Sequence, residues 1–322
     1  MSKLVRIVVS LALLGWLASR TDWPQVYATF SQLRLDCWLA ALAAFIIIQA
    51  ISSVRWQILA GALGILRTRR QLMAYYFIGM YFNLVLPTSV GGDVVRVWYL
   101  DHRKGQRQRA FLSVLGDRLS GFLALFAIAL AASLLSPIGL PGWVHASVWG
   151  SAAAVVIGLA SLPLINRIPW LVRSDRKLVR KFVDLSGQLT SFLPQTVRPA
   201  VMSLSLIVQA GNVLIVWLLG MALGLEVPGS YYWIVVPMVT VITLLPLSLN
   251  GMGVREAGMV LFLAPLGVPA GLALSLSFLW FCVCSLAALV VGGGLHVFGR
   301  FKAPDAEELA EGETSARQGV AA

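Results

Sequence analysis

The chain has 322 residues, of which 58% are hydrophobic and 12% charged, and its mean hydropathy is +0.82. Soluble domains average about 45–50% apolar and about 25% charged residues, so this composition excludes a soluble globular protein. The net charge of +11 does not indicate a nucleic-acid partner, because the basic residues fall almost wholly between apolar runs, where membrane topology explains them. Long apolar runs without alternation predict membrane-spanning helices rather than a barrel.

The first apolar run, residues 4–19, has the charged start and short apolar centre of a signal peptide. Trp16 and Leu17 occupy positions that a cleavage site would fill with small residues. We therefore predict an uncleaved first helix, followed by a loop over residues 20–36 that carries no net charge.

Five further apolar segments are each long enough to cross a membrane as a single helix. They are residues 38–58, 110–136, 144–165, 199–223 and 270–298. Two other apolar segments, residues 72–100 and 231–267, contain proline and glycine in their middles and are predicted to be broken helices.

The two broken segments carry the same motif, about half the chain apart. Residues 86–96 read Leu-Pro-Thr-Ser-Val-Gly-Gly-Asp-Val-Val-Arg, and residues 245–255 read Leu-Pro-Leu-Ser-Leu-Asn-Gly-Met-Gly-Val-Arg. Matching breaks in the two halves of a membrane protein indicate an inverted repeat with a binding site near the bilayer midplane. The expected repeats are residues 37–166 and 199–300, within one transmembrane domain over residues 1–300.

The distribution of Lys and Arg predicts the topology. If the N-terminus is cytoplasmic and each broken segment is a re-entrant hairpin, six full spans remain, and 19 of the 25 basic residues are cytoplasmic. Only Arg20 and Arg34 then lie outside, which is the positive-inside pattern, so both termini are predicted to be cytoplasmic. Eight full spans would keep the same terminal sides but would worsen this charge split.

Residues 167–198 separate the two repeats and are strongly basic. Apolar residues recur there at intervals of three or four, namely Leu178, Phe182, Leu185, Leu189 and Phe192. This pattern predicts a basic amphipathic helix, which either attracts anionic lipid headgroups or simply links the two halves on the cytoplasmic side. Residues 301–322 are acidic and rich in small residues, so a disordered tail is expected.

Each broken segment combines features that suit a phosphate-bearing ligand. Proline ends one half-helix, and Ser89 or Ser248 can cap the next, whose free amides and positive dipole end favour anions. Arg96 and Arg255 follow seven residues later on the same helical face, where a guanidinium can hold phosphate through two hydrogen bonds. The alternative is that these arginines neutralise nearby carboxylates, namely Asp93, Asp117 and Glu256.

Asp117 and Arg118 lie well inside the predicted helix 110–136, and charges within a membrane are most often functional. The alternative is a local ion pair that only supports packing. Arg55 lies near the cytoplasmic end of its predicted helix, from where its side chain could reach the headgroups. Interhelical hydrogen bonding is the favoured role of four amides, Gln49, Asn83, Gln209 and Asn212, although they could also line a cavity. The candidate substrate-binding residues are Arg55, Asn83, Ser89, Gly91, Gly92, Asp93, Arg96, Asp117, Arg118, Ser248, Asn250, Gly251, Gly253, Arg255 and Glu256.

Sequence signatures of common enzymes are missing. There is no nucleotide-binding loop, no His/Cys metal cluster and no Ser-His-Asp set, so neither a cofactor nor a metal is expected. This favours a transporter over two alternatives: a membrane enzyme of lipid or lipid-linked glycan synthesis, and an accessory subunit of such an enzyme.

These motifs resemble the flippase-like domain family, the transmembrane domain of lysylphosphatidylglycerol synthases. The resemblance covers roughly residues 5–300 and rests on four stretches: residues 53–56, 83–96, 117–121 and 245–256. It implies a flippase of the bacterial inner membrane that moves a polar or anionic lipid between leaflets. Its partners would be anionic membrane lipids, with a lipid-modifying enzyme or a second copy of the chain as further candidates. The cytosolic aminoacyl-transfer domain of the fused synthases is missing, so synthase activity is not expected.

Overall fold

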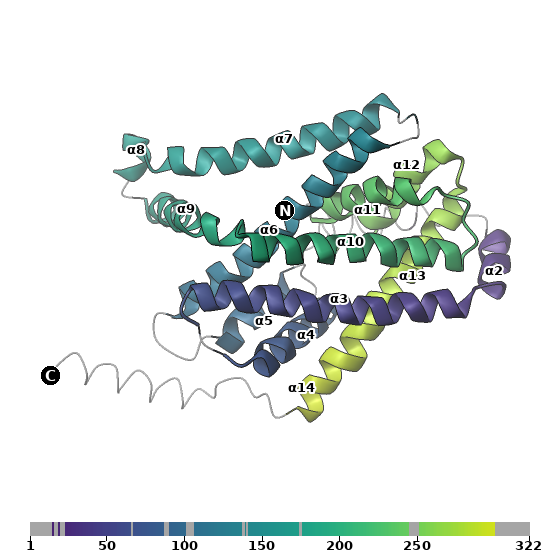
Figure 1. Cartoon of the computed structure of the whole chain (residues 1–322), viewed down its shortest axis with the longest axis horizontal. Helices are drawn as coiled ribbons and strands as arrows, with labels where there is room; N and C mark the ends of the chain where they lie inside the picture. The colour runs from purple at the N-terminus through teal and green to yellow at the C-terminus, as the bar shows by residue number, and fades with distance from the viewer. Residues whose placement is uncertain are drawn as a thin grey trace.

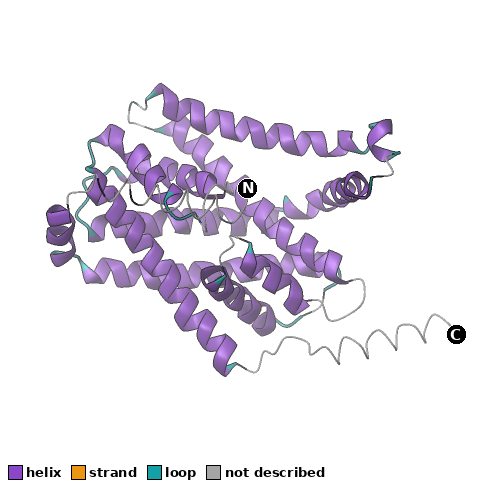
Figure 2. Cartoon of the chain, turned by 180° about the vertical axis from the view of Figure 1, so that it is seen from behind, coloured by secondary structure: helices purple, strands orange, loops and turns teal. Residues whose placement is uncertain are grey.

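The computed structural model of the chain describes residues 23–65, 67–86, 90–100, 106–136, 141–173, 176–244 and 251–299, with isolated positions 15, 19 and 139. Every regular element in these residues is a helix, and none is a strand (Figure 2). All but two residues of the expected helix 4–19 lie outside the described residues, as does the whole expected tail 301–322.

Five helices of the described chain are long and apolar enough to cross a membrane. They coincide with the five single-helix spans expected after the first one, so the protein is an all-helical, multi-pass membrane protein. They are α3 (Leu35–Ala62), α6 (Gln106–Leu135), α7 (Gly142–Ile165), α10 (Pro199–Ala222), and α13 (Ala270–Ala287), which continues through the π-helical η2 (Ala288–Gly293) into α14 (Gly294–Phe298).

Each predicted broken segment consists of two short helices packed against each other. The first pair is α4 (Arg69–Val85) with α5 (Gly91–Leu100), and the second is α11 (Gly229–Leu244) with α12 (Val254–Leu263), extended by the 3-10 turn η1 (Ala264–Leu266). Even α4, with 17 residues, is only about 25 Å long at 1.5 Å per residue, less than the roughly 30 Å hydrocarbon core. That the two pairs are re-entrant stays a prediction.

Two stretches differ from the sequence expectation. The loop expected over residues 20–36 contains α2 (Trp23–Ser31), in which Pro24 occupies the first turn, a favourable position for proline. Phe30 of this helix packs edge-on against Phe278 of α13, with ring centroids 6.2 Å apart. Helix α3 continues beyond Ile58 to Ala62.

The amphipathic linker forms the short α8 (Pro169–Val172) and the longer α9 (Lys177–Thr196), and α9 packs on α6 and α7. Of the apolar residues that set its expected periodicity, Phe192 is buried against α6, whereas Phe182 is 54% exposed. Part of the apolar face of α9 is therefore already covered within the molecule.

Helices α3 and α10 lie side by side along most of their lengths (Figure 1). The amide of Arg34 donates to the carbonyl of Ala222 at 3.0 Å, which joins the start of α3 to the end of α10. Gly211 permits this close packing, because a Cβ there would clash with Ile48. Helix α6 packs on both members of the pair and α4 packs on α3, with α5 against α4 and α6. Helix α13 also packs on both members and α11 packs on α10, with α12 against α11 and α13.

Candidate functional site

A close crossing of α4 and α5 positions the candidate residues of the first motif. A Cβ on Gly92 would clash with the carbonyl oxygen of Gly79, so the two helices meet at a pair of glycines. The amide of Gly92 donates to Oδ1 of Asn83 at 2.7 Å. We expected this amide to face a ligand, but it is already hydrogen-bonded to α4. Gly91 and Gly92 both lie buried at the start of α5.

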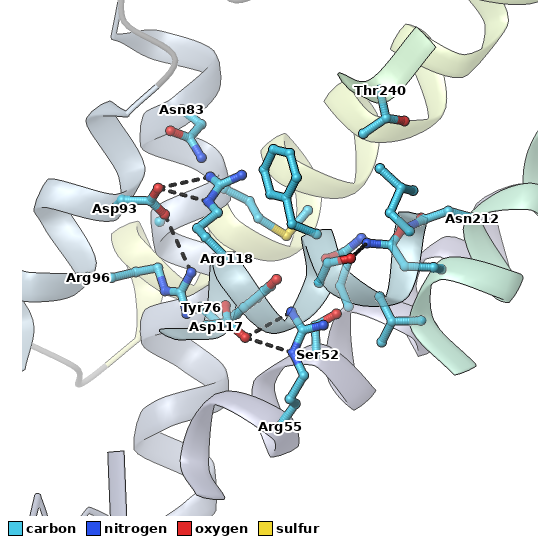
Figure 3. Close-up of a pocket in the computed structure, with 18 of the residues that line it drawn as sticks. Ser52, Arg55, Tyr76, Asn83, Asp93, Arg96, Asp117, Arg118, Asn212 and Thr240 are labelled. Atoms are coloured by element: carbon cyan, nitrogen blue, oxygen red, sulfur yellow. Dashed lines mark hydrogen bonds and ion pairs between the residues drawn. The ribbon is translucent and has the colours of Figure 1, made fainter. Parts of the chain in front are cut away.

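The crossing brings five charged side chains from three helices into one chain of ion pairs (Figure 3). Asp117 of α6 accepts from Arg55 of α3, Nη2 to Oδ1, at 2.8 Å, and from Arg96 of α5, Nη2 to Oδ2, at 2.9 Å. Asp93 of α5 accepts from Arg96 at 3.4 Å and from Arg118 of α6 at 3.0 Å. Asp117 and Arg118 therefore do not pair with each other, and each joins α6 to α5 separately.

The members of this charge cluster differ in exposure. The side chains of Arg55, Arg96 and Asp117 are 6%, 6% and 2% exposed, and that of Asp93 is 12% exposed. Arg118 is 41% exposed, and Asp93 is its ion-pair partner. Three guanidinium groups against two carboxylates leave a formal charge of +1, and the accessible part of that charge is on Arg118.

Arg55 and Arg96 are held by further contacts. The guanidinium of Arg96 lies 4.1 Å from the ring centre of Trp56 and 4.5 Å from that of Tyr76, a cation–π arrangement on both rings. Arg55 donates to Oγ of Ser205 at 3.1 Å. The expectation that Arg55 reaches the headgroups is therefore wrong, because Asp117 and Ser205 fix its side chain inside the protein.

A polar cavity of about 310 Å³ opens beside the charge cluster. Its walls come from α3, α4, α5, α6 and α10, with Thr240 contributed by α11. All five charged residues line it, together with the four amides Gln49, Asn83, Gln209 and Asn212. Two of these amides also bond between helices, because Gln209 donates to the Gly121 carbonyl at 2.9 Å and Asn83 accepts from the amide of Gly92. Both roles considered for the amides therefore apply to Asn83 and Gln209.

The described part of the second motif, residues 251–255, belongs to a separate cluster and does not line this cavity. Nη2 of Arg255 pairs with Oε1 of Glu256 at 2.6 Å, and Ser277 of α13 bonds to both side chains. Oε2 of Glu256 accepts from the amide of Gly253 at 2.7 Å, which ties the start of α12. Gly251 and Gly253 have φ of 77° and 81°, a conformation that favours glycine.

The structure therefore brings together Arg55, Asn83, Asp93, Arg96, Asp117 and Arg118, and it places Arg255 and Glu256 elsewhere. Ser89, Ser248 and Asn250 lie outside the described residues. Sequence reasoning missed the aromatic pair on Arg96 and the hydroxyl of Ser205. Trp56 directly follows Arg55 in the sequence, and this aromatic residue is the signal that could have indicated the rings around Arg96. Within the described part of the chain, no three His, Cys, Asp or Glu residues group closely enough for a metal ion.

Comparison with known proteins agrees with this architecture. A family model described as the lysylphosphatidylglycerol synthase TM region matches residues 3–292. A UPF0104 membrane protein of Methanothermobacter thermautotrophicus is 24% identical over 255 residues, which cover 71% of this chain and 75% of that protein. No solved structure matches the chain. The resemblance inferred from the motifs is confirmed, and the chain belongs to the family of the lysylphosphatidylglycerol synthase transmembrane region.

Proposed function

We propose that the protein is a lipid flippase that binds a phosphate-bearing headgroup in the polar cavity and moves the lipid between leaflets. The observation that carries this proposal is the unbalanced charge of the cluster. Three arginines face two aspartates inside a membrane protein, and the most accessible of the three, Arg118, lines the cavity. A net positive charge within a membrane protein is costly, so an anion in the cavity is favoured.

A phosphodiester fits this site in charge, geometry and size. Its single negative charge would bring the cluster from +1 to zero. The planar guanidinium of Arg118 can hold two phosphate oxygens at once. A cavity of about 310 Å³ lies at the lower end of the roughly 300–1,000 Å³ range of ligand pockets, which suits a headgroup rather than a whole lipid.

Family membership supports a lipid as the ligand, because the matching model describes the membrane region of a lipid-modifying enzyme. The proposal includes a location in the bacterial cytoplasmic membrane with both termini on the cytoplasmic side. It also retains the re-entrant hairpins and the inverted repeat. Among the alternatives, an enzyme using Asp93 and Asp117 as acid and base is less favoured, because each carboxylate is bound by two guanidinium groups.

Leaflet exchange in reconstituted vesicles tests the proposal. Vesicles of phosphatidylcholine and phosphatidylglycerol, with trace fluorescent phosphatidylglycerol, are treated with an external reductant that bleaches only the outer leaflet. We expect wild-type protein to speed the loss of the protected fluorescence, and Arg118→Gln to slow it at least tenfold. Arg198→Gln, at an exposed arginine of the linker, is the control and should behave as wild type. If wild-type vesicles bleach no faster than empty ones for anionic and zwitterionic lipids alike, the protein is not a flippase.

A further inference from the structure

An apolar groove lies on the other side of the Asp93–Arg118 ion pair. It has a volume of about 700 Å³ and runs between α5, α6 and α9. Its apolar walls are Val94, Val97, Trp98, Phe111, Leu115 and Leu185. Val94, Trp98 and Phe111 are exposed, so nothing in the described chain covers these walls.

The groove and the polar cavity share one wall. Asp93 and Arg118 line both spaces, and they are the only residues in the described chain that line both. The ion pair between them therefore separates a small polar chamber from a larger apolar one. A phospholipid has this same division, with a compact charged headgroup joined to long apolar chains.

Charge also distinguishes this groove from the apolar surface that faces any bilayer. Arg107 of α6 and Lys181 of α9 line it in addition to Arg118, while Asp93 and Asp184 are its acidic residues. Three cations against two carboxylates leave a net charge of +1 along the otherwise apolar groove. An anionic amphiphile complements both features, whereas a neutral apolar ligand complements only the apolar walls.

The Asp93–Arg118 pair can open without leaving a carboxylate unpaired, and it is the pair of the charge cluster that contains the most exposed arginine. Asp93 has a second partner in Arg96, whose Nη1 lies 3.4 Å from Oδ1. The side chain of Arg118 is 41% exposed, so it can move with less loss of packing than Arg55 or Arg96. A phosphate arriving from the groove can replace Asp93 as the partner of Arg118.

We propose that this groove holds one acyl chain of an anionic phospholipid while its phosphate takes the place of Asp93 on Arg118. The groove is then the lateral entrance through which a lipid headgroup reaches the polar cavity. This inference rests on the proposed function, because it assumes that the cavity binds the headgroup. It adds the position of the chain and identifies the ion pair that the headgroup must open.

Photochemical labelling tests the position of the acyl chain. The full-length protein in detergent is mixed with substoichiometric phosphatidylglycerol that carries a diazirine on one acyl chain, then irradiated and digested for mass spectrometry. We expect adducts on α5, α6 and α9 at the groove walls. Val94→Trp should reduce these adducts at least fivefold by filling the groove, and the smaller Val94→Phe provides a milder substitution should Trp prevent folding.

Val156→Trp in α7 is the matched control, because Val156 is 63% exposed and Val94 is 61% exposed. It should leave the groove adducts unchanged. Adducts that survive Val94→Trp and Val94→Phe, or that form only on other helices, overturn the inference. Competition of the adducts by glycerol 3-phosphate is measured in parallel and reports the headgroup site alone. Headgroup competition with adducts away from the groove would therefore contradict the inference and leave the proposed function standing.

Discussion

At the scale of single residues, the two aspartates of the charge cluster have different roles. Asp117 is 2% exposed and receives two buried arginines, so it holds α3, α5 and α6 together. Asp93 shares Arg96 with Asp117 and reaches outward to Arg118. The inner half of the cluster therefore joins the helices, and the proposed function assigns ligand binding to its more exposed outer half.

Asp117→Asn should destabilise the protein far more than Arg118→Gln. The first change leaves two buried guanidinium groups against one remaining carboxylate, and breaking a buried pair typically costs about 3–5 kcal/mol. The second change removes a partly exposed cation, and Asp93 keeps Arg96, so a cost below about 1 kcal/mol is expected. Free energies of unfolding from titration with a denaturing detergent give the comparison. Equal losses for the two variants would show that the cluster is uniformly structural.

The alternative considered from the sequence, that Arg96 and Arg255 pair with nearby carboxylates, is what the structure shows, but the partners of Arg55 and Arg118 were not predicted. Arg96 lies three residues from Asp93, so that pair was foreseeable from helical spacing. The Asp117 pairs with Arg55 and Arg96 join residues 62 and 21 positions apart, and they depend on how three helices cross. The sequence predicted the same role for Arg96 and Arg255 because their motifs match. In the structure, Arg255 bonds to its neighbour Glu256 and does not line the cavity.

At the scale of helices, the crossing of α4 and α5 determines the position of Asp93 and Arg96. The crossing requires Gly79 and Gly92, since a side chain at Gly92 would meet the α4 backbone, which cannot move aside like a flexible side chain. The membrane helices themselves were predicted well from the sequence. Long apolar runs and paired helix breakers mark the membrane helices directly, whereas the glycine contact across helices leaves no local pattern.

Gly92→Ala should separate α5 from α4 and lower both stability and lipid exchange. The added methyl clashes with the Gly79 carbonyl and also disturbs the Gly92–Asn83 hydrogen bond. Gly158→Ala in α7 is the matched control, because a Cβ there meets nothing within 4 Å, and alanine in a helix is favoured over glycine by roughly 0.5–1 kcal/mol. Melting temperature and exchange rate are the readouts. A Gly92→Ala protein as stable and active as Gly158→Ala would contradict the role given to the crossing.

At the scale of the whole molecule, the two halves share a motif but not an environment. Both helices of the first broken pair, α4 and α5, border the polar cavity. Of the described residues of the second pair, only Thr240 of α11 lines it, and α12 begins at the cluster of Arg255, Glu256 and Ser277. Composition and the long apolar runs were enough to predict the fold class and the long helices. The cavity also needs α3 of the first half and α10 of the second, and no motif encodes how these helices pack.

Cysteine accessibility tests the predicted topology. In a background with Cys37, Cys282 and Cys284 replaced by serine, Gln108→Cys at the start of α6 should react with an impermeant maleimide only after the membrane is opened. Gln32→Cys, before α3, should react in intact spheroplasts. Both positions are exposed, so the reagent can reach them on the side where each lies. Labelling of Gln108→Cys from outside would mean that α4 and α5 do not form a cytoplasmic hairpin.

The central claim is that Arg118 binds the phosphate of an anionic lipid in the polar cavity, and lipid affinity measured by native mass spectrometry tests it most directly. Wild-type protein should retain phosphatidylglycerol over phosphatidylcholine. Arg118→Gln should bind phosphatidylglycerol roughly 10- to 150-fold more weakly, the equivalent of about 1.5–3 kcal/mol for a charged hydrogen-bonded contact, and Arg118→Lys should fall between the two. Arg198→Gln should match wild type. Equal retention of phosphatidylglycerol by wild type and a folded Arg118→Gln would contradict the claim and place the lipid site elsewhere.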